Sequence, residues 1–120
     1  MSVTDTLPAE CQGVDFDKVL EQLPPHMEER LFSAGEQRLR ELEQAMARGD
    51  AAAVMDAAHS VASLTGFLHI EALVTYAQDI YVAAHQGDLG AARHAHERLA
   101  IVMAWALGRV RAPGQTEARG

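Results

Sequence analysis

The chain has 120 residues, of which 48% are hydrophobic but only 5% are aromatic, and its formal net charge at pH 7 is −7. This length predicts one domain with a real core, and the shortage of aromatic residues predicts that Ala, Leu and Val fill it, which suits close-packed helices better than a β-sandwich. The acidic balance argues against nucleic acid as a partner, because neutralising phosphates requires a positive surface.

The cysteine content and the hydropathy pattern bear on the compartment. Cys11 is the single cysteine, which excludes an internal disulfide and a zinc site built from cysteines, and favours a reducing compartment. We find no run of about 18 apolar residues that would cross a bilayer, and the first residues lack the basic and apolar regions of a signal peptide. We therefore expect a cytoplasmic protein with no membrane partner.

The N-terminal part contains one short predicted helix. Residues 1–12 have no periodic pattern, so we expect a flexible N-terminal tail. Asp15 is positioned to cap a helix that ends at about Leu23. The Pro-Pro pair that follows cannot continue a helical hydrogen-bond ladder.

Glycine-aspartate pairs separate the longer predicted helices. The second helix covers about residues 25–48, and Gly35 inside it indicates either a weak point or a close approach to a neighbour. Gly49 and Asp50 then supply a glycine stop and an aspartate cap for the next helix. The same pair recurs at residues 87–88. Two such joints between helical patterns are typical of tight antiparallel helical hairpins.

Three further helices are predicted, at about residues 51–68, 70–86 and 89–110, and no segment alternates with the period of a strand. Residues 112–120 contain Pro, Gly and polar residues, so we expect a flexible C-terminal tail. The predicted fold class is all-α: an up-down antiparallel four-helix bundle over residues 13–111, with a short leading N-terminal helix.

His59 lies outside the apolar stripe of its predicted helix. The residues at core spacing there are Val54, Ala57, Ala58, Val61, Thr65 and Leu68. At about 100° per residue, His59 is rotated by about 140° from Val54. The residues on its own face are Met55, Ala62, Ser63 and Gly66. Apart from the methionine these residues are small, so the imidazole is open to a second protein. The alternative is an ordinary surface residue, which a lone exposed histidine on an alanine-rich helix commonly is.

The stretch from Ala58 to Leu73, AHSVASLTGFLHIEAL, resembles the acceptor segment of histidine-containing phosphotransfer (HPt) domains. In that family the histidine lies mid-helix in a pattern of the type His-x-Leu-Lys-Gly-Ser/Ala, with a Gly or similar small residue about ten positions on. His59 and the aliphatic Val61 fall at matching positions, and the two Gly-Asp joints resemble the family's entries to the histidine helix and the last helix. The resemblance covers about residues 25–110.

Three positions depart from the family pattern. Ala62 stands where the family usually has Lys, Ser63 where it usually has Gly, and His69 where the later Gly is expected. The lysine offsets phosphoryl charge in the transferring state, and residues 49–92 contain no Lys or Arg at all. Serine at position 63 is small and can donate a hydrogen bond to a phosphoryl oxygen, but it supplies no charge.

Two functional hypotheses follow. The resemblance implies a histidine phosphotransfer protein of a two-component phosphorelay, with His59 as the phosphoryl acceptor and its four same-face neighbours as the partner-docking face. The implied partners are response-regulator receiver domains or a hybrid sensor kinase. The chain is then a phosphoryl carrier without a cofactor of its own, since the receiver holds the Mg²⁺. The alternative is a degenerate HPt-like adaptor that binds a receiver or sensor kinase without carrying phosphate.

The remaining histidines do not predict a metal site. His94 and His96 are two residues apart on a helix, which places them on different faces, and no Cys or HExxH-type pattern accompanies them. His96 lies on the core stripe, where we expect it to have a hydrogen-bond partner. The sequence contains no Gly-rich phosphate-binding loop, so ATP binding is not indicated.

Overall fold

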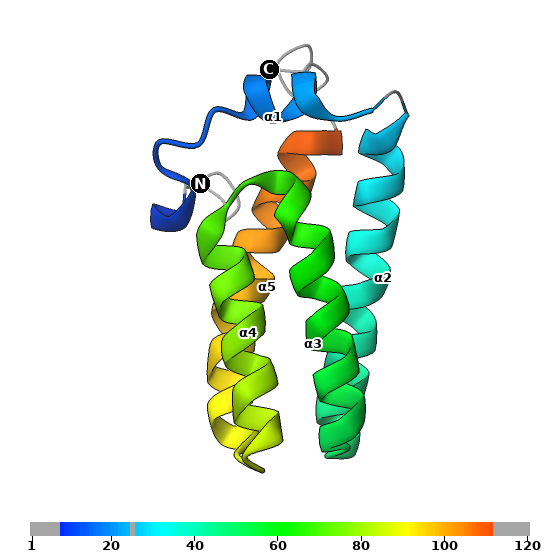
Figure 1. Cartoon of the computed structure of the whole chain (residues 1–120), viewed down its shortest axis with the longest axis vertical. Helices are drawn as coiled ribbons and strands as arrows, with labels where there is room; N and C mark the ends of the chain where they lie inside the picture. The colour runs from blue at the N-terminus through cyan, green and yellow to red at the C-terminus, as the bar shows by residue number, and fades with distance from the viewer. Residues whose placement is uncertain (1–7, 25, 112–120) are drawn as a thin grey trace, which may run out of the picture.

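The part of the chain that this computed structural model describes, residues 8–24 and 26–111, is helical and contains no strand. Its short 3-10 helices are η2 (Ala9–Cys11) and η3 (Gly66–Leu68). Its α-helices are α1 (Phe16–Gln22), α2 (Met27–Arg48), α3 (Ala51–Thr65), α4 (Glu71–His85) and α5 (Leu89–Arg111) (Figure 1). The predicted all-α class is therefore confirmed for the described residues.

Helices α2, α3, α4 and α5 lie side by side and form a helical bundle (Figure 1). Helix α3 contacts both α2 and α4, and α5 contacts the same two helices. The short helix α1 lies across one end of the bundle and contacts α5. The Cα radius of gyration is 14.5 Å, close to that of a compact domain of this length.

The two Gly-Asp joints have the geometry that the sequence predicts. Gly49 and Gly87 have φ angles of 68° and 77°, a left-handed conformation that glycine adopts without steric cost. Asp50 and Asp88 follow, and each carboxylate accepts a hydrogen bond from the backbone amide three residues on, at 3.1 Å and 3.0 Å. The amides of both aspartates bond back to carbonyls of the preceding helix. The joints therefore fix where α2 and α4 end and where α3 and α5 begin.

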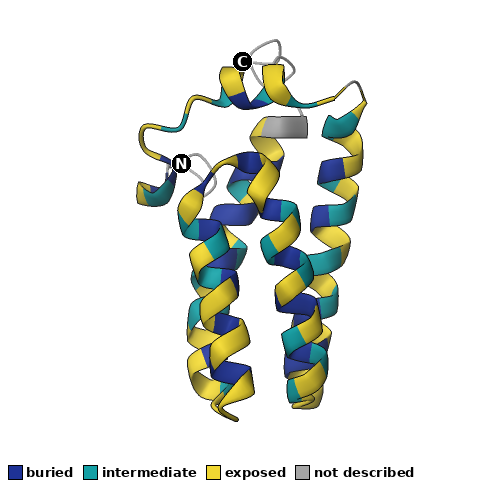
Figure 2. Ribbon diagram, viewed as in Figure 1, coloured by how far each residue is buried: buried dark blue, intermediate teal, exposed yellow. Residues whose placement is uncertain are grey.

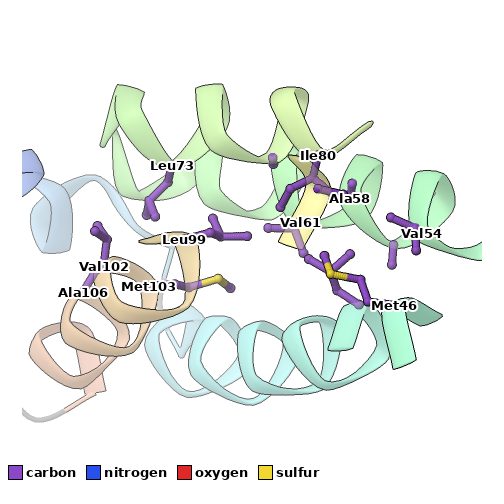
Figure 3. Packing of buried hydrophobic residues seen from close by; sticks show 14 of the residues in the cluster. Met46, Val54, Ala58, Val61, Leu73, Ile80, Leu99, Val102, Met103 and Ala106 are labelled. Carbon is purple, nitrogen blue, oxygen red and sulfur yellow. The ribbon is translucent and has the colours of Figure 1, made fainter. Parts of the chain in front are cut away.

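Aliphatic residues and alanine fill the core, as the composition predicts. The stripe predicted for residues 51–68 is buried in full, and its last member, Leu68, lies in η3. Figure 3 shows Val54, Ala58 and Val61 beside side chains from the other helices, and Figure 2 shows buried and exposed residues recurring along each helix. Gly35 is a close approach, since a Cβ atom there would lie 2.7 Å from Leu107 Cδ1.

Residues 8–12 pack against the bundle, which differs from the flexible tail predicted for residues 1–12. Cys11 is 2% exposed and joins the hydrophobic core. The carboxylate of Glu10 accepts hydrogen bonds from two guanidinium nitrogens of Arg98, at 2.5 and 2.6 Å, and from the hydroxyl of Tyr76 at 2.7 Å. Hydropathy periodicity cannot reveal a one-turn segment held by partners on α4 and α5. The remaining predicted tail residues, 1–7 and 112–120, lie outside the described residues.

The hydrogen bonds and the burial of this N-terminal segment shift the pKa values of Glu10 and Cys11. Hydrogen bonds from the Arg98 guanidinium lower the pKa of Glu10 to about 2, against the smaller opposing effect of burial. Burial raises the pKa of the Cys11 thiol to about 11. The thiol is therefore protonated at neutral pH, and the carboxylate beside it is charged.

One segment contradicts the expectation that no run is apolar enough to cross a bilayer. Among the described residues, the helical segment Ala51–Leu68 has the length and composition of a membrane span, with a mean hydropathy of 1.2. The many alanines of this segment raise its mean hydropathy, although it also contains polar residues such as Asp56 and His59. One such helix is weak evidence for a span. In this segment 28% of the residues are buried, and they form the stripe described above.

Candidate functional site

His59 is exposed near the middle of α3, on the side away from the core stripe. The cap at Asp50 fixes the start of the helix and Val54, Ala58 and Val61 anchor its inner face, each 0% exposed. With that face fixed, the helical repeat carries the imidazole outward. Of its predicted same-face neighbours, Ser63 and Gly66 are exposed, and Met55 and Ala62 are half-buried.

A groove of about 520 Å³ lies between α3 and α4, and His59 forms part of its wall. The lining residues are Ala58, His59, Ala62, Ser63, Val74, Ala77, Gln78, Tyr81 and Val82. The structure thus brings three predicted site residues together in one groove: His59, Ala62 and Ser63. Met55 and Gly66 do not line it.

Helix α4 contributes the half of the groove that the sequence analysis missed. Tyr81 and Val82 are 40% and 51% exposed, which is high for large apolar side chains. Single exposed apolar residues are common on protein surfaces, but these two share a groove with Val74 and Ala77. Both lie off the core stripe of α4. A search for large apolar residues outside the stripes, applied to every helix, would have found them.

The hydroxyl of Ser63 is already engaged within α3. It donates a hydrogen bond to the backbone carbonyl oxygen of His59, at 3.2 Å. Serine side chains on helices commonly bond back to the carbonyl four residues earlier. Donation to a phosphoryl oxygen on the imidazole, the role anticipated from the sequence, requires this hydrogen bond to break first.

Positive charge is scarce on the two helices that form the groove. Neither α3 nor α4 contains Lys or Arg, and the exposed Asp56 lies one turn before His59. Arg93 is the first basic residue after this stretch, and its guanidinium donates to the backbone carbonyl of Met46, at the end of α2, at 3.3 Å. The groove therefore has no cation from its own helices.

His96 has a different environment from the one expected. It is half-buried, and its Nε2 atom has no hydrogen-bond partner within the part of the chain that the structure describes. The carboxylate of Glu43 lies 3.6 Å from that nitrogen, which forms an ion pair only if the imidazole is protonated. The hydrogen bond expected for His96 is therefore not made by its Nε2 atom. Within residues 8–24 and 26–111, no three His, Cys, Asp or Glu side chains are grouped so that they could hold a metal ion.

Comparisons of the chain with models of protein families, with curated proteins and with solved structures gave no significant match. The chemistry that the site can support is therefore inferred from its own residues. It combines an exposed imidazole, which is a nucleophile when neutral, with an apolar groove that can receive a side chain or helix of a second protein.

Proposed function

We propose that this chain is a histidine phosphotransfer protein that relays a phosphoryl group between receiver-domain aspartates through His59. The observation that carries the proposal is the position of this imidazole: exposed, near the middle of α3, and in the wall of a groove where its neighbours Ala62 and Ser63 are small. A phosphoryl carrier needs such a position, because the reacting groups of a second protein must approach the ring.

We also propose that α2, α3, α4 and α5 form an up-down antiparallel bundle. The tight Gly-Asp joints and the contacts of α3 and α5 with both α2 and α4 support this topology.

The backbone conformation of His69 supports the resemblance to HPt domains. Its φ of 56° is left-handed, and this is the position where HPt domains usually have a glycine, the residue that adopts this conformation most readily.

In the proposed reaction, a lone pair on a neutral ring nitrogen of His59 attacks the phosphorus of a receiver's aspartyl phosphate, in line with the leaving oxygen. The nitrogen–phosphorus bond forms as the phosphorus–oxygen bond breaks, and that electron pair stays on the aspartate carboxylate. A second receiver reverses these steps. As the resemblance implies, the receiver supplies the acidic residues and Mg²⁺, so the chain acts as a carrier without a cofactor of its own.

A second candidate function is a phosphate-free adaptor that docks a receiver or sensor kinase through the same groove. The absence of Lys and Arg from residues 49–92 favours it, because phosphoryl charge on His59 has no local cation to offset it. Both readings place the chain in the cytoplasm with receiver domains or a hybrid sensor kinase as partners.

Binding and labelling measured on the same receivers separate the two candidates. The chain is mixed with a panel of phosphorylated receiver domains, and complex formation and transferred label are followed in parallel. A carrier takes acid-labile, alkali-stable label from at least one receiver that binds it. Binding without label from any receiver supports the adaptor, and neither binding nor label contradicts both.

A further inference from the structure

A second groove, of about 440 Å³, lies between α4 and α5 and shares no lining residue with the groove beside His59. Helix α4 lines it with Tyr76 and Asp79, and α5 lines it with residues between His94 and Ile101. Because successive residues of a helix are rotated by about 100°, the two α4 residues lie on the opposite face of that helix from those that line the first groove. A ligand in this second groove therefore leaves the His59 groove free.

The charges that line the second groove are mainly negative. Two exposed carboxylates contribute to it, Asp79 from α4 and Glu97 from α5. Arg98 also lines it, but its guanidinium donates to both carboxylate oxygens of Glu10, at 2.5 and 2.6 Å, so its charge is already compensated. His94 counts as neutral at pH 7. The groove therefore attracts a cation and repels an anion.

Apolar and aromatic surface accompanies these carboxylates. Ile101 is 46% exposed and lines the groove beside the half-buried Ala95. Tyr76 is half-buried, and its hydroxyl donates to Glu10 at 2.7 Å, which holds the ring in the groove wall. Covering such surface removes apolar area from water, which favours association. A ligand that fits this groove therefore combines a positive charge with apolar or planar surface.

Arginine meets these requirements better than lysine. Its guanidinium is planar, carries five N–H donors in a fixed fork, and stacks on aromatic rings. It is therefore suited to two carboxylates that come from different helices and to the ring of Tyr76 beside them. The lysine ammonium is compact and strongly hydrated, so it gains less from such a surface.

We propose that the α4–α5 groove binds an arginine side chain of a second protein, with the guanidinium paired with Asp79 and Glu97 and an apolar neighbour of that arginine on Ile101. This inference goes beyond the proposed function and does not depend on it. It gives the chain a protein-binding surface on the side of α4 that faces away from the His59 groove.

The probe is a capped pentapeptide, Gly-Arg-Gly-Leu-Gly, whose Arg and Leu lie on the same side of an extended backbone. Its matched control has citrulline, a neutral analogue of the same shape, in place of the arginine. Amide shifts of the isotope-labelled full chain report binding at low ionic strength, where exposed charges are least screened.

Exposed ion pairs are individually weak, so we expect the Arg peptide to bind about threefold to tenfold more tightly than the citrulline peptide. The shifted amides should lie on α4 and α5 around the groove. Equal binding of the two peptides, shifts confined to other helices, or no shift at millimolar peptide overturns the inference.

Substitutions that remove one negative charge provide the site control. Asp79→Asn and Glu97→Gln neutralise the two groove carboxylates, and Asp56→Asn neutralises an exposed carboxylate on α3 that does not line the groove. All three positions are exposed, so we expect the fold to be retained. Each groove variant should weaken the Arg peptide by about threefold, and Asp56→Asn by less than about 1.5-fold. Equal losses in all three show a general charge effect and overturn the proposed site.

The apolar contact has its own matched pair. Ile101→Ser and Val82→Ser remove side chains of similar exposure, 46% and 51%, and only Ile101 lines the α4–α5 groove. We expect Ile101→Ser to weaken the Arg and citrulline peptides alike, by about threefold, and Val82→Ser to change neither. An equal or larger loss with Val82→Ser places the peptide outside the α4–α5 groove and overturns the proposal.

Discussion

The hydroxyl of Ser63 donates its hydrogen bond to the backbone carbonyl of His59, one turn earlier on α3. The Ser63 hydroxyl, which the sequence suggested as a donor to a phosphoryl group on His59, is thus satisfied within its own helix. Helix α3 contains no lysine that could take its place.

Ser63→Ala is therefore expected to leave phosphotransfer nearly unchanged. Because the hydroxyl bonds to the helix backbone, its removal alters the transfer rate by less than about threefold. Rapid-quench measurement of label transfer from a phosphorylated receiver checks this. A loss of tenfold or more would show that the hydroxyl leaves the His59 carbonyl and contacts the phosphoryl group in the complex.

Restoring the missing cation with Ala62→Lys is expected to increase the transfer rate or the lifetime of the phospho-form. One charge-assisted interaction at this partly exposed site contributes on the order of 1–2 kcal/mol, a several-fold to roughly thirtyfold effect. Ala62→Met is the control, since it adds a side chain of comparable length without charge. If Lys and Met have equal effects, the change reflects groove filling and a residue elsewhere already supplies the charge.

Because α2 and α5 approach closely at Gly35, we expect Gly→Ala to have opposite effects on stability at Gly35 and at Gly108. Gly108 has open space around it, so Gly108→Ala should stabilise the fold by about 0.5–1 kcal/mol through helix propensity. Gly35→Ala gains the same propensity, but its Cβ meets the buried Leu107 at 2.7 Å. Overpacking of this kind costs about 1–3 kcal/mol, so the net effect is destabilising. Urea unfolding monitored by circular dichroism measures both, and equal stabilisation would contradict the close approach.

The contact between Glu10 and Arg98 predicts an acid-sensitive N-terminal segment. The folded-state pKa of Glu10, about 2, lies below its ordinary value of 4.5. Its stabilising contribution is therefore complete above pH 4.5 and is lost as the pH falls from there toward 2. We expect the stability of the native chain to fall more steeply over this range than that of Glu10→Gln, as measured by urea unfolding at each pH.

The same variant has a second readout at neutral pH. Cys11, the residue after Glu10, is buried in the core, so Glu10→Gln should increase the rate at which an aromatic disulfide reagent modifies the thiol. Glu29→Gln, at an exposed position on α2, is the control. Equal rates of thiol modification in both variants would mean that Glu10 does not hold residues 8–11 in place.

Local features of the fold were predictable from the sequence, and long-range features were not. Most bounds of the helices follow from periodicity and from capping residues such as Asp15 and Asp50, whose partners lie three residues away. The helix predicted for residues 51–68 is an exception, because α3 ends at Thr65 and residues 66–68 form the 3-10 helix η3. The contact of Glu10 with Arg98 joins residues 88 positions apart, and no local pattern encodes it. This distance explains why the N-terminal segment was expected to be a tail.

The candidate site also has features that the sequence predicts and features that it does not. The exposure of His59 and the small residues beside it follow from the helical repeat of α3 alone. The contribution of Tyr81 and Val82 depends on how α4 packs beside α3, which the pattern of one helix does not specify. The engagement of the Ser63 hydroxyl depends on its rotamer, and the sequence leaves that choice open.

The position of the label shows whether His59 carries a phosphoryl group. The native chain, His59→Gln and His94→Gln are each incubated with a phosphorylated receiver that binds the native chain, and the phosphorylated residue is identified by mass spectrometry under alkaline conditions. His94 is an exposed histidine on α5 and serves as the matched control. We expect acid-labile label on His59 in the native chain and in His94→Gln, and none in His59→Gln. Undiminished label in His59→Gln, or no label in a native chain that binds the receiver, would show that His59 is not the phosphoryl carrier.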